Sequence, residues 1–340
     1  MIAVRTVSIG LLNLLWLAES AAFAQTAPAS GAPASAAIAA PAVAASSEPA
    51  AIPAATALGS GHYPALMESD PGLPTHTIYR PADFGALGDY KLPIVVWGNG
   101  ACANAGNRFR WFLSEVSSYG FLVIAAGPIG AASLEYSLPL DYVRRPMRMP
   151  SPAQLPPPAT HSSQLIDAMN WAIAENERAA SPYFHRLAVG KIAVMGQSCG
   201  GVQAIEASRD PRVTTTMVWN SGLLPEPSTM AGGKTMTKAD LGTLHAPTAY
   251  ISGDSQDIAF ANANDDFERL NSIPVFRGYE SGIPHGGTYR QPGGGEFAGV
   301  AVAWLQWQLL HDERAKLMFA GKNCGLCVNP RWVARSKRID

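Results

Sequence analysis

The stretch KIAVMGQSCGG, residues 191–201, constrains the fold of this 340-residue chain more than any other part of the sequence. Its apolar run at 191–195 predicts a buried strand, and a helix is expected at 201–208. The short connection between them must be a sharp turn whose central residue, Ser198, has a strained backbone conformation. Gly196 and Gly200 are the small neighbours that such a turn requires. The stretch therefore predicts a tight strand-to-helix turn that presents the Ser198 side chain above a sheet.

Short β-rich apolar runs alternate with longer amphipathic segments along the rest of the chain. Strands are expected at 76–80, 93–97, 121–125, 191–195, 213–220, 247–252 and 274–279, and helices at 108–118, 161–176, 201–208, 261–270 and 297–310. The last of these helices is expected to be amphipathic. This alternation is typical of strands joined by crossover helices. The sequence therefore predicts an α/β fold, a single domain in which helices flank a mostly parallel central sheet.

A segment rich in proline and methionine, residues 128–158, interrupts this alternation. Its sequence RRPMRMPSPAQLPPP cannot form a regular helix, because proline lacks an N–H donor and clashes with the preceding turn. We expect the segment to form a loop or a lid inserted into the domain.

The N-terminal region has the composition of an export signal followed by a tether. Residues 1–24 contain Arg5, an apolar run at 9–18 and an Ala-Phe-Ala site, which is typical of a cleaved signal peptide. A membrane anchor is the alternative, but the run is shorter than the ~20 residues that span a bilayer. Residues 25–58 are almost entirely small residues and proline, which predicts a disordered linker. Residues 59–340 are the expected folded domain, exported to the periplasm or the extracellular space, without membrane insertion after signal cleavage.

Charge and motif content exclude several classes of partner. The chain has 25 Lys and Arg against 26 Asp and Glu, and only 15% of its residues are charged. Nucleic acids and anionic membranes bind basic patches, so neither is an expected partner. The sequence also lacks a metal-ligand cluster and a phosphate-binding glycine loop, so no metal or other cofactor is expected. It carries no signal for an oligomeric state.

The four cysteines, at 102, 199, 324 and 327, predict disulfides in an exported chain. Cys324 and Cys327 lie in a polar C-terminal tail without a surrounding βαβ pattern. A local disulfide is therefore favoured there over a redox centre, and two thiols do not complete a zinc site.

Ser198 is a candidate nucleophile. A serine hydroxyl is protonated at neutral pH, so it needs a neighbouring base, and the base needs a carboxylate to orient it. Where a nucleophile follows a central strand, both partners are expected on loops after later strands. Two of the seven histidines, His285 and His311, follow the last predicted strand. His311 ends a predicted helix, so only His285 lies on the loop directly after that strand.

Two carboxylates, Asp254 and Asp257, follow the predicted strand at 247–252. Asp257 is favoured as the acid because a helix is expected to open there, whereas Asp254 can cap the turn. Asp265 and Asp266 are interpreted as part of a solvated helix face.

Acyl transfer also needs donors for an oxyanion. The backbone N–H of Cys199 is the first candidate, because it follows the nucleophile. The turn WGNGAC supplies the second, through the backbone of Ala101, because Gly98 and Gly100 allow a close approach of the main chain.

Six motifs together resemble α/β-hydrolases: VVWGNGAC, GQSCGG, DIAFANA, PHGGTY, GGEFAGVAVAWLQWQL and CGLC. More narrowly, the chain is similar to a poorly characterised group of secreted bacterial and fungal α/β-hydrolases, and to dienelactone-hydrolase-like and cutinase-like polyester esterases. The resemblance covers residues 75–337. It implies a serine hydrolase acting on small-molecule or polymeric esters through an acyl-serine intermediate, with Ser198 as nucleophile, His285 as base and Asp257 as acid.

The turn Trp97-Gly98-Asn99-Gly100 departs from the HGGG of many lipases and esterases, so the resemblance does not fix the second oxyanion donor. Cys102 and Cys199 lie in segments that should converge at the oxyanion hole, and we hypothesise a disulfide between them. Two separate buried thiols are the alternative. Hydrolysis of an amide, peptide or lactone by the same residues, and a non-catalytic exported binding protein of the same fold, also remain open.

Overall fold

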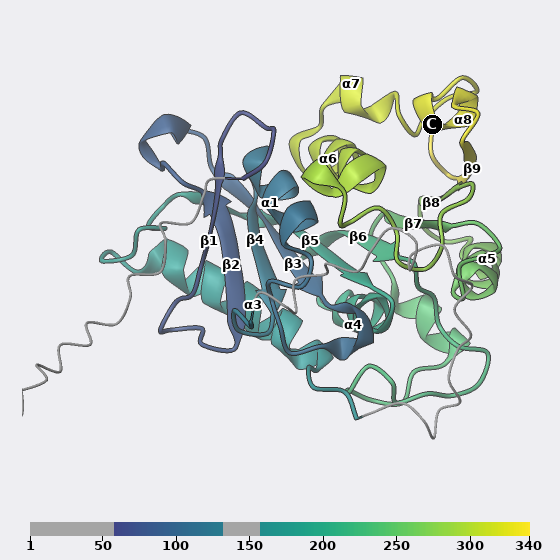
Figure 1. Ribbon diagram of the computed structural model, residues 1–340, viewed down its shortest axis with the longest axis horizontal. Helices are drawn as coiled ribbons and strands as arrows, with labels where there is room; N and C mark the ends of the chain where they lie inside the picture. The colour runs from purple at the N-terminus through teal and green to yellow at the C-terminus, as the bar shows by residue number, and fades with distance from the viewer. Residues whose placement is uncertain (1–57, 132–156) are drawn as a thin grey trace, which may run out of the picture. The chain divides into compact units, whose positions relative to one another are not determined.

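The structure is a computed structural model that describes residues 58–131 and 157–340, all of which belong to one compact unit (Figure 1). The expected signal peptide, nearly all of the expected linker and most of the expected loop or lid lie outside the described residues.

The described residues form a mixed sheet of nine strands (Figure 1). The strands are β1 (Ala65–Glu68), β2 (His76–Pro81), β3 (Leu92–Gly98), β4 (Leu122–Ala126), β5 (Leu187–Gln197), β6 (Val213–Trp219), β7 (Thr248–Gly253), β8 (Val275–Glu280) and β9 (Trp332–Lys337). Their spatial order is β1-β2-β4-β3-β5-β6-β7-β8-β9. The strands from β4 to β8 in this order are parallel, whereas β1, β2 and β9 pair antiparallel. The predicted α/β class with a mostly parallel sheet is confirmed.

Helices cover both faces of the sheet. They are α1 (Arg110–Ser118), α3 (Ser162–Glu177), α4 (Cys199–Ala207), α5 (Phe260–Arg269), α6 (Gly295–Leu310), α7 (Glu313–Lys316) and α8 (Gly325–Val328). Alternate residues of a strand point to opposite faces. On β3, Val95 and Trp97 therefore pack with α1 and α6, whereas Ile94 and Val96 pack with α3 and α4 (Figure 1). Every residue of β3 is buried, as in a central strand of a parallel sheet covered on both faces.

The C-terminal segment differs from the expected polar tail, because it forms α7, α8 and the edge strand β9. The apolar part of β9, WVARSK, is only three residues long, and only its first residue, Trp332, is buried. An edge strand with mostly exposed side chains gives no long apolar run, so the pairing of β9 with β8 is not predictable from hydrophobicity.

Helix α6 also differs from expectation, because it is not amphipathic. Its side chains from Phe297 to Leu305 are buried except at Gly299. The C-terminal segment covers the side of the helix that would otherwise meet solvent. The ring of Phe319 lies 5.0 Å from that of Trp304 and 5.8 Å from that of Trp307, measured between centroids.

Candidate active site

Ser198 occupies a sharp turn between β5, which ends at Gln197, and α4, which begins at Cys199. Its backbone has φ 54° and ψ −120°, a conformation that a residue with a side chain rarely adopts. A Cβ atom at Gly196 would lie 2.0 Å from the carbonyl oxygen of Gly200. One at Gly200 would lie 2.0 Å from the carbonyl oxygen of Gly98. The glycines on both sides of Ser198 therefore allow backbone contacts that any larger residue would prevent.

The structure brings Ser198, His285 and Asp257 together at the carboxyl ends of parallel strands. Nε2 of His285 lies 2.9 Å from Oγ of Ser198, and its Nδ1 lies 2.7 Å from Oδ1 of Asp257. Asp257 follows β7 and His285 follows β8. Because a carboxylate accepts the bond at Nδ1, that nitrogen carries the proton, and the lone pair of Nε2 faces the serine hydroxyl.

The carboxylate of Asp257 is buried and fully satisfied by hydrogen bonds. Besides His285, the backbone N–H of Ala259 donates to Oδ1 over 2.9 Å. Oδ2 accepts from Nδ2 of Asn220 over 2.8 Å and from the backbone N–H of Gly253 over 3.3 Å. Four donors thus hold a charged group that has no exposed surface.

Asp254, the other candidate acid, makes different contacts. Its Oδ1 accepts from the backbone N–H of Gln256 over 3.0 Å, and its Oδ2 accepts from that of Gly282 over 2.7 Å. It therefore links two surface loops. The structure brings Asp257, and not Asp254, within hydrogen-bond distance of the imidazole.

Three residues that the sequence did not indicate support this arrangement. The hydroxyl of Tyr289 donates to Oδ1 of Asn220 over 2.5 Å, which orients the Asn220 amide toward Asp257. Nε2 of Gln197 donates to the carbonyl oxygen of His285 over 3.1 Å. The only sequence signal was the position of Asn220, a polar residue directly after β6, and that signal is shared by many strand ends.

The two candidate oxyanion donors lie on backbones that touch. Cys199 is the first residue of α4 and Ala101 is the second residue of η2, a short 3₁₀ helix at Gly100–Cys102, so neither N–H has a partner within its own helix. The backbones meet at Gly98 and Gly200, where a Cβ atom on Gly200 would lie 2.0 Å from the Gly98 carbonyl oxygen, and Gly100 lies against the side chain of Gln197. Ala101 is exposed.

All four cysteines form disulfides, one between Cys102 and Cys199 and the other between Cys324 and Cys327. The expected local pair at the C-terminal end is confirmed, and so is the hypothesised pair beside Ser198. The alternative of two free buried thiols is wrong.

A small cavity opens beside the serine. Its volume is about 20 Å³, enough for about one methyl group or water molecule. The residues that line it come from four segments: Ser198, Asn220, Ser221, Gly222, Leu224, Met230, Ile258, Ala259, Asn262 and His285.

The expectation that Asp265 and Asp266 are part of a solvated helix face is wrong for Asp266. Its side chain is fully buried, whereas that of the adjacent Asp265 is 42% exposed. Oδ1 of Asp266 accepts from Lys238 Nζ over 2.6 Å, and Oδ2 accepts from the backbone N–H of Leu223 over 2.8 Å. Burial raises the pKa of Asp266 to about 6, against the opposing effect of Lys238. Adjacent residues of a helix point about 100° apart, so one lies in solvent and the other in the core.

Within residues 58–131 and 157–340, no group of three or more metal-ligating side chains is placed to hold an ion. No helix in these described ranges has the length and apolar content needed to cross a bilayer. No family model matches the chain, and a search of curated proteins finds no relative. The chemistry of the site is therefore inferred from its own residues.

Proposed function

We propose that this protein is an exported serine hydrolase of the α/β-hydrolase fold that cleaves carboxylic esters of small acyl groups. The observation that carries the proposal is the unbroken chain of hydrogen bonds from Ser198 through His285 to Asp257. A serine hydroxyl, an imidazole and a buried carboxylate in this order are the parts needed for an activated nucleophile.

The reaction follows from these positions. Nε2 of His285 accepts the hydroxyl proton as Oγ of Ser198 attacks the ester carbonyl. The resulting oxyanion accepts hydrogen bonds from the N–H groups of Cys199 and Ala101. His285 then donates its proton to the departing alcohol, which leaves an acyl group on Ser198. Water, deprotonated by the same imidazole, hydrolyses this acyl-serine and restores the site.

The topology supports the α/β-hydrolase assignment. In that fold, the nucleophile follows a central strand in a glycine-flanked turn, and the acid and the histidine follow in that chain order. Here the same order places Ser198 after β5, Asp257 after β7 and His285 after β8. The strained φ of Ser198 is what the nucleophile turn of that fold requires.

The cavity beside Ser198 supports a small acyl group. Its volume of about 20 Å³ accepts the methyl group of an acetyl ester, and the side chains of Met230 and Ile258 line it. The two disulfides are compatible with an oxidising compartment, which supports export.

Hydrolysis of p-nitrophenyl acetate by the wild type and by Ser198→Ala tests the proposal. We expect the substitution to lower kcat by at least about 10³-fold. Equal rates for the two proteins would overturn the proposal, and so would a wild type that hydrolyses no acetate, butyrate or octanoate ester. Activity that depends on Ser198 toward an amide, peptide or lactone, but toward no ester, would reassign the substrate class and keep the nucleophile.

A further inference from the structure

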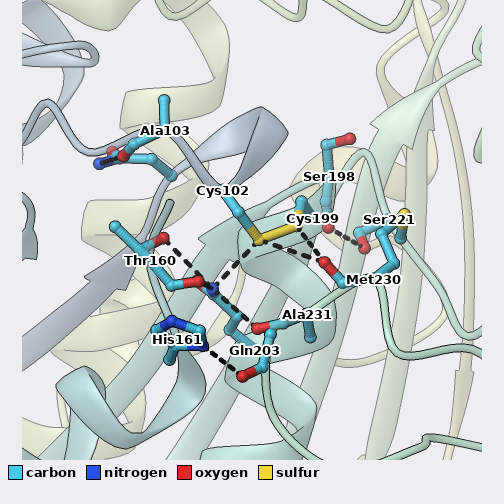
Figure 2. Close-up of a disulfide and its surroundings, with 12 residues drawn as sticks. Cys102, Ala103, Thr160, His161, Ser198, Cys199, Gln203, Ser221, Met230 and Ala231 are labelled. Carbon is cyan, nitrogen blue, oxygen red and sulfur yellow. Dashed lines mark hydrogen bonds between the residues drawn. A yellow bond between two sulfur atoms is a disulfide. The ribbon is translucent and has the colours of Figure 1, made fainter. Parts of the chain in front are cut away.

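The Cys102–Cys199 disulfide joins two segments that are 97 residues apart, and each cysteine directly follows a residue of the proposed machinery. Cys102 follows Ala101, a proposed oxyanion donor, and Cys199 follows Ser198. Figure 2 shows the sulfur bridge between the turn that contains Cys102 and the start of the helix that follows Ser198. The bridge therefore connects the two sides of the proposed oxyanion hole.

The turn that contains Ala101 has a backbone that needs support. Ala101 has φ 56° and Cys102 has φ 46°, two consecutive residues in the left-handed region although neither is glycine. Such conformations persist only where the surroundings hold them. Asn99 holds the turn from one side, because its Nδ2 donates to the carbonyl oxygens of Ala105 and Ala126 over 3.1 and 2.6 Å. The disulfide holds it from the other side.

The Gln203 side chain lies directly beneath the bridge (Figure 2). Its Nε2 lies 3.1 Å from Sγ of Cys102, 2.9 Å from the carbonyl oxygen of Thr160 and 3.0 Å from that of Ala231. All three are acceptors, so the amide nitrogen faces them. Oε1 of this fully buried side chain has no hydrogen-bond partner among the described residues. The amide thus tolerates an unsatisfied oxygen while it ties three segments to the disulfide.

The bridge also supports one wall of the cavity. The carbonyl oxygen of Met230 lies 3.0 Å from Sγ of Cys199. A disulfide sulfur carries no hydrogen, so this is a packing contact between oxygen and sulfur. Because Met230 lines the cavity beside Ser198, a shift of the sulfurs would move that wall as well as the oxyanion turn.

We propose that Cys102, Cys199 and Gln203 are positioning residues, which hold the Ala101 N–H and the Met230 wall in register with Oγ of Ser198. This inference rests on the proposed function. Without the bridge, the ground-state ester still binds, whereas the oxyanion of the transition state loses an aligned donor. The loss therefore falls on kcat more than on KM.

The test compares Cys102→Ser/Cys199→Ser with Cys324→Ser/Cys327→Ser, which removes the other disulfide by the same chemical change. We expect the first double variant to lower kcat by at least about 10-fold with KM within about 3-fold, since displacements of about 1 Å cost up to about 10²-fold. The inhibition constant of a boronic acid, whose adduct places an oxygen in the oxyanion hole, should rise in parallel with the loss of kcat. The control variant should keep wild-type values of all three constants.

Two further measurements test the proposal if Cys102→Ser/Cys199→Ser does not fold. Gln203→Met keeps the disulfide and the side-chain volume but removes the amide donor, and it should lower kcat in the same direction. Dithiothreitol should lower wild-type kcat as it reduces the bridge to two thiols and is itself oxidised to its cyclic disulfide. Oxidised glutathione should then restore the activity, and the redox state is read by mass after alkylation.

Unchanged kcat and boronic acid affinity in a folded Cys102→Ser/Cys199→Ser variant, or a loss through KM alone, would overturn the inference while leaving the hydrolase proposal intact. Where the double variant does not fold, unchanged constants in both Gln203→Met and the reduced wild type would overturn it. A wild type without activity that depends on Ser198 would instead remove the proposed function, and the inference with it.

Discussion

Replacement of Asp257 by asparagine is expected to abolish the base function of His285 by changing which ring nitrogen carries the proton. In the wild type, Oδ1 accepts from Nδ1 of His285 and from the Ala259 N–H, and Oδ2 accepts from Asn220 and the Gly253 N–H. An asparagine has one oxygen and one NH2 group for these two positions. An NH2 group at the Oδ2 position would face two fixed donors, the Asn220 amide and the Gly253 N–H. At the Oδ1 position it would face only one fixed donor, the Ala259 N–H, because the imidazole of His285 can move its proton to the other ring nitrogen. The NH2 group therefore faces His285, the proton moves to Nε2, and Ser198 loses its acceptor.

The size of this effect follows from the chemistry. A triad held in the wrong tautomer loses about 10³- to 10⁴-fold in kcat, or about 4–5.5 kcal/mol of transition-state stabilisation at 1.36 kcal/mol per tenfold. The free energy of unfolding should fall less, by about 1–3 kcal/mol, since the Ala259 N–H then faces another donor. The variant should remain folded while it loses nearly all activity.

The assay is kcat with p-nitrophenyl acetate at saturation, together with the NMR signal of the imidazole Nδ1–H, which should be lost in the variant. Asp254→Asn is the matched control, because it makes the same change three residues away in a loop. A kcat of Asp257→Asn within about tenfold of the wild type, or an equal loss in Asp254→Asn, would refute the reasoning.

Three further predictions concern the turn, the cavity and a buried charge. Gly200→Ala should lower the free energy of unfolding by about 1–3 kcal/mol in chemical denaturation, because its Cβ would lie 2.0 Å from the Gly98 carbonyl oxygen. Met230→Ala should raise the ratio of kcat/KM for butyrate over acetate by about 10-fold, since two more methylenes find space; an unchanged ratio would exclude this residue as the limiting wall. The pKa of Asp266 is raised to about 6 from 3.8, so the folded state retains a proton that the unfolded chain has released, and stability falls as pH rises from about 4 to about 6, by up to about 3 kcal/mol. In urea titrations at pH 4 and pH 7, Asp266→Asn should remove most of that decrease in stability. An unchanged pH dependence would show that the raised pKa of Asp266 is not its cause.

Much of the sheet is predictable because its central strands are buried on both faces. Such strands are continuous apolar runs, as in residues 93–97 and 121–125, and they are recognisable without knowledge of their neighbours. Edge strands β1 and β9 lack this signal, because their side chains are partly exposed. Their position depends on pairing with β2 and β8, which is a tertiary property.

The candidate site also contains residues that are predictable from the sequence and residues that are not. Ser198, Asp257 and His285 were predictable because the loops after parallel strands meet at one edge of the sheet, so chain order selects among the polar residues. Asn220 donates a hydrogen bond to Asp257, Gln197 donates one to the backbone of His285, and Tyr289 donates one to Asn220. Their roles depend on distances of about 3 Å that no spacing in the sequence encodes.

The backbone itself gives an independent indication of where the function lies. Of the seven described residues other than glycine with positive φ, four surround the site: Ala101, Cys102, Ser198 and Asn220. Alanine, cysteine and serine give no sequence warning of such a conformation, which is why only the glycines of these turns marked them. Each strained residue destabilises the fold by about 1–3 kcal/mol, so neighbouring interactions must hold it in place. The disulfide and Asn99 hold the oxyanion turn, and Asp257 and Tyr289 hold Asn220. A stable scaffold alone does not require strain gathered at one edge of its sheet, so this strain supports the proposal of a pre-organised reaction centre there.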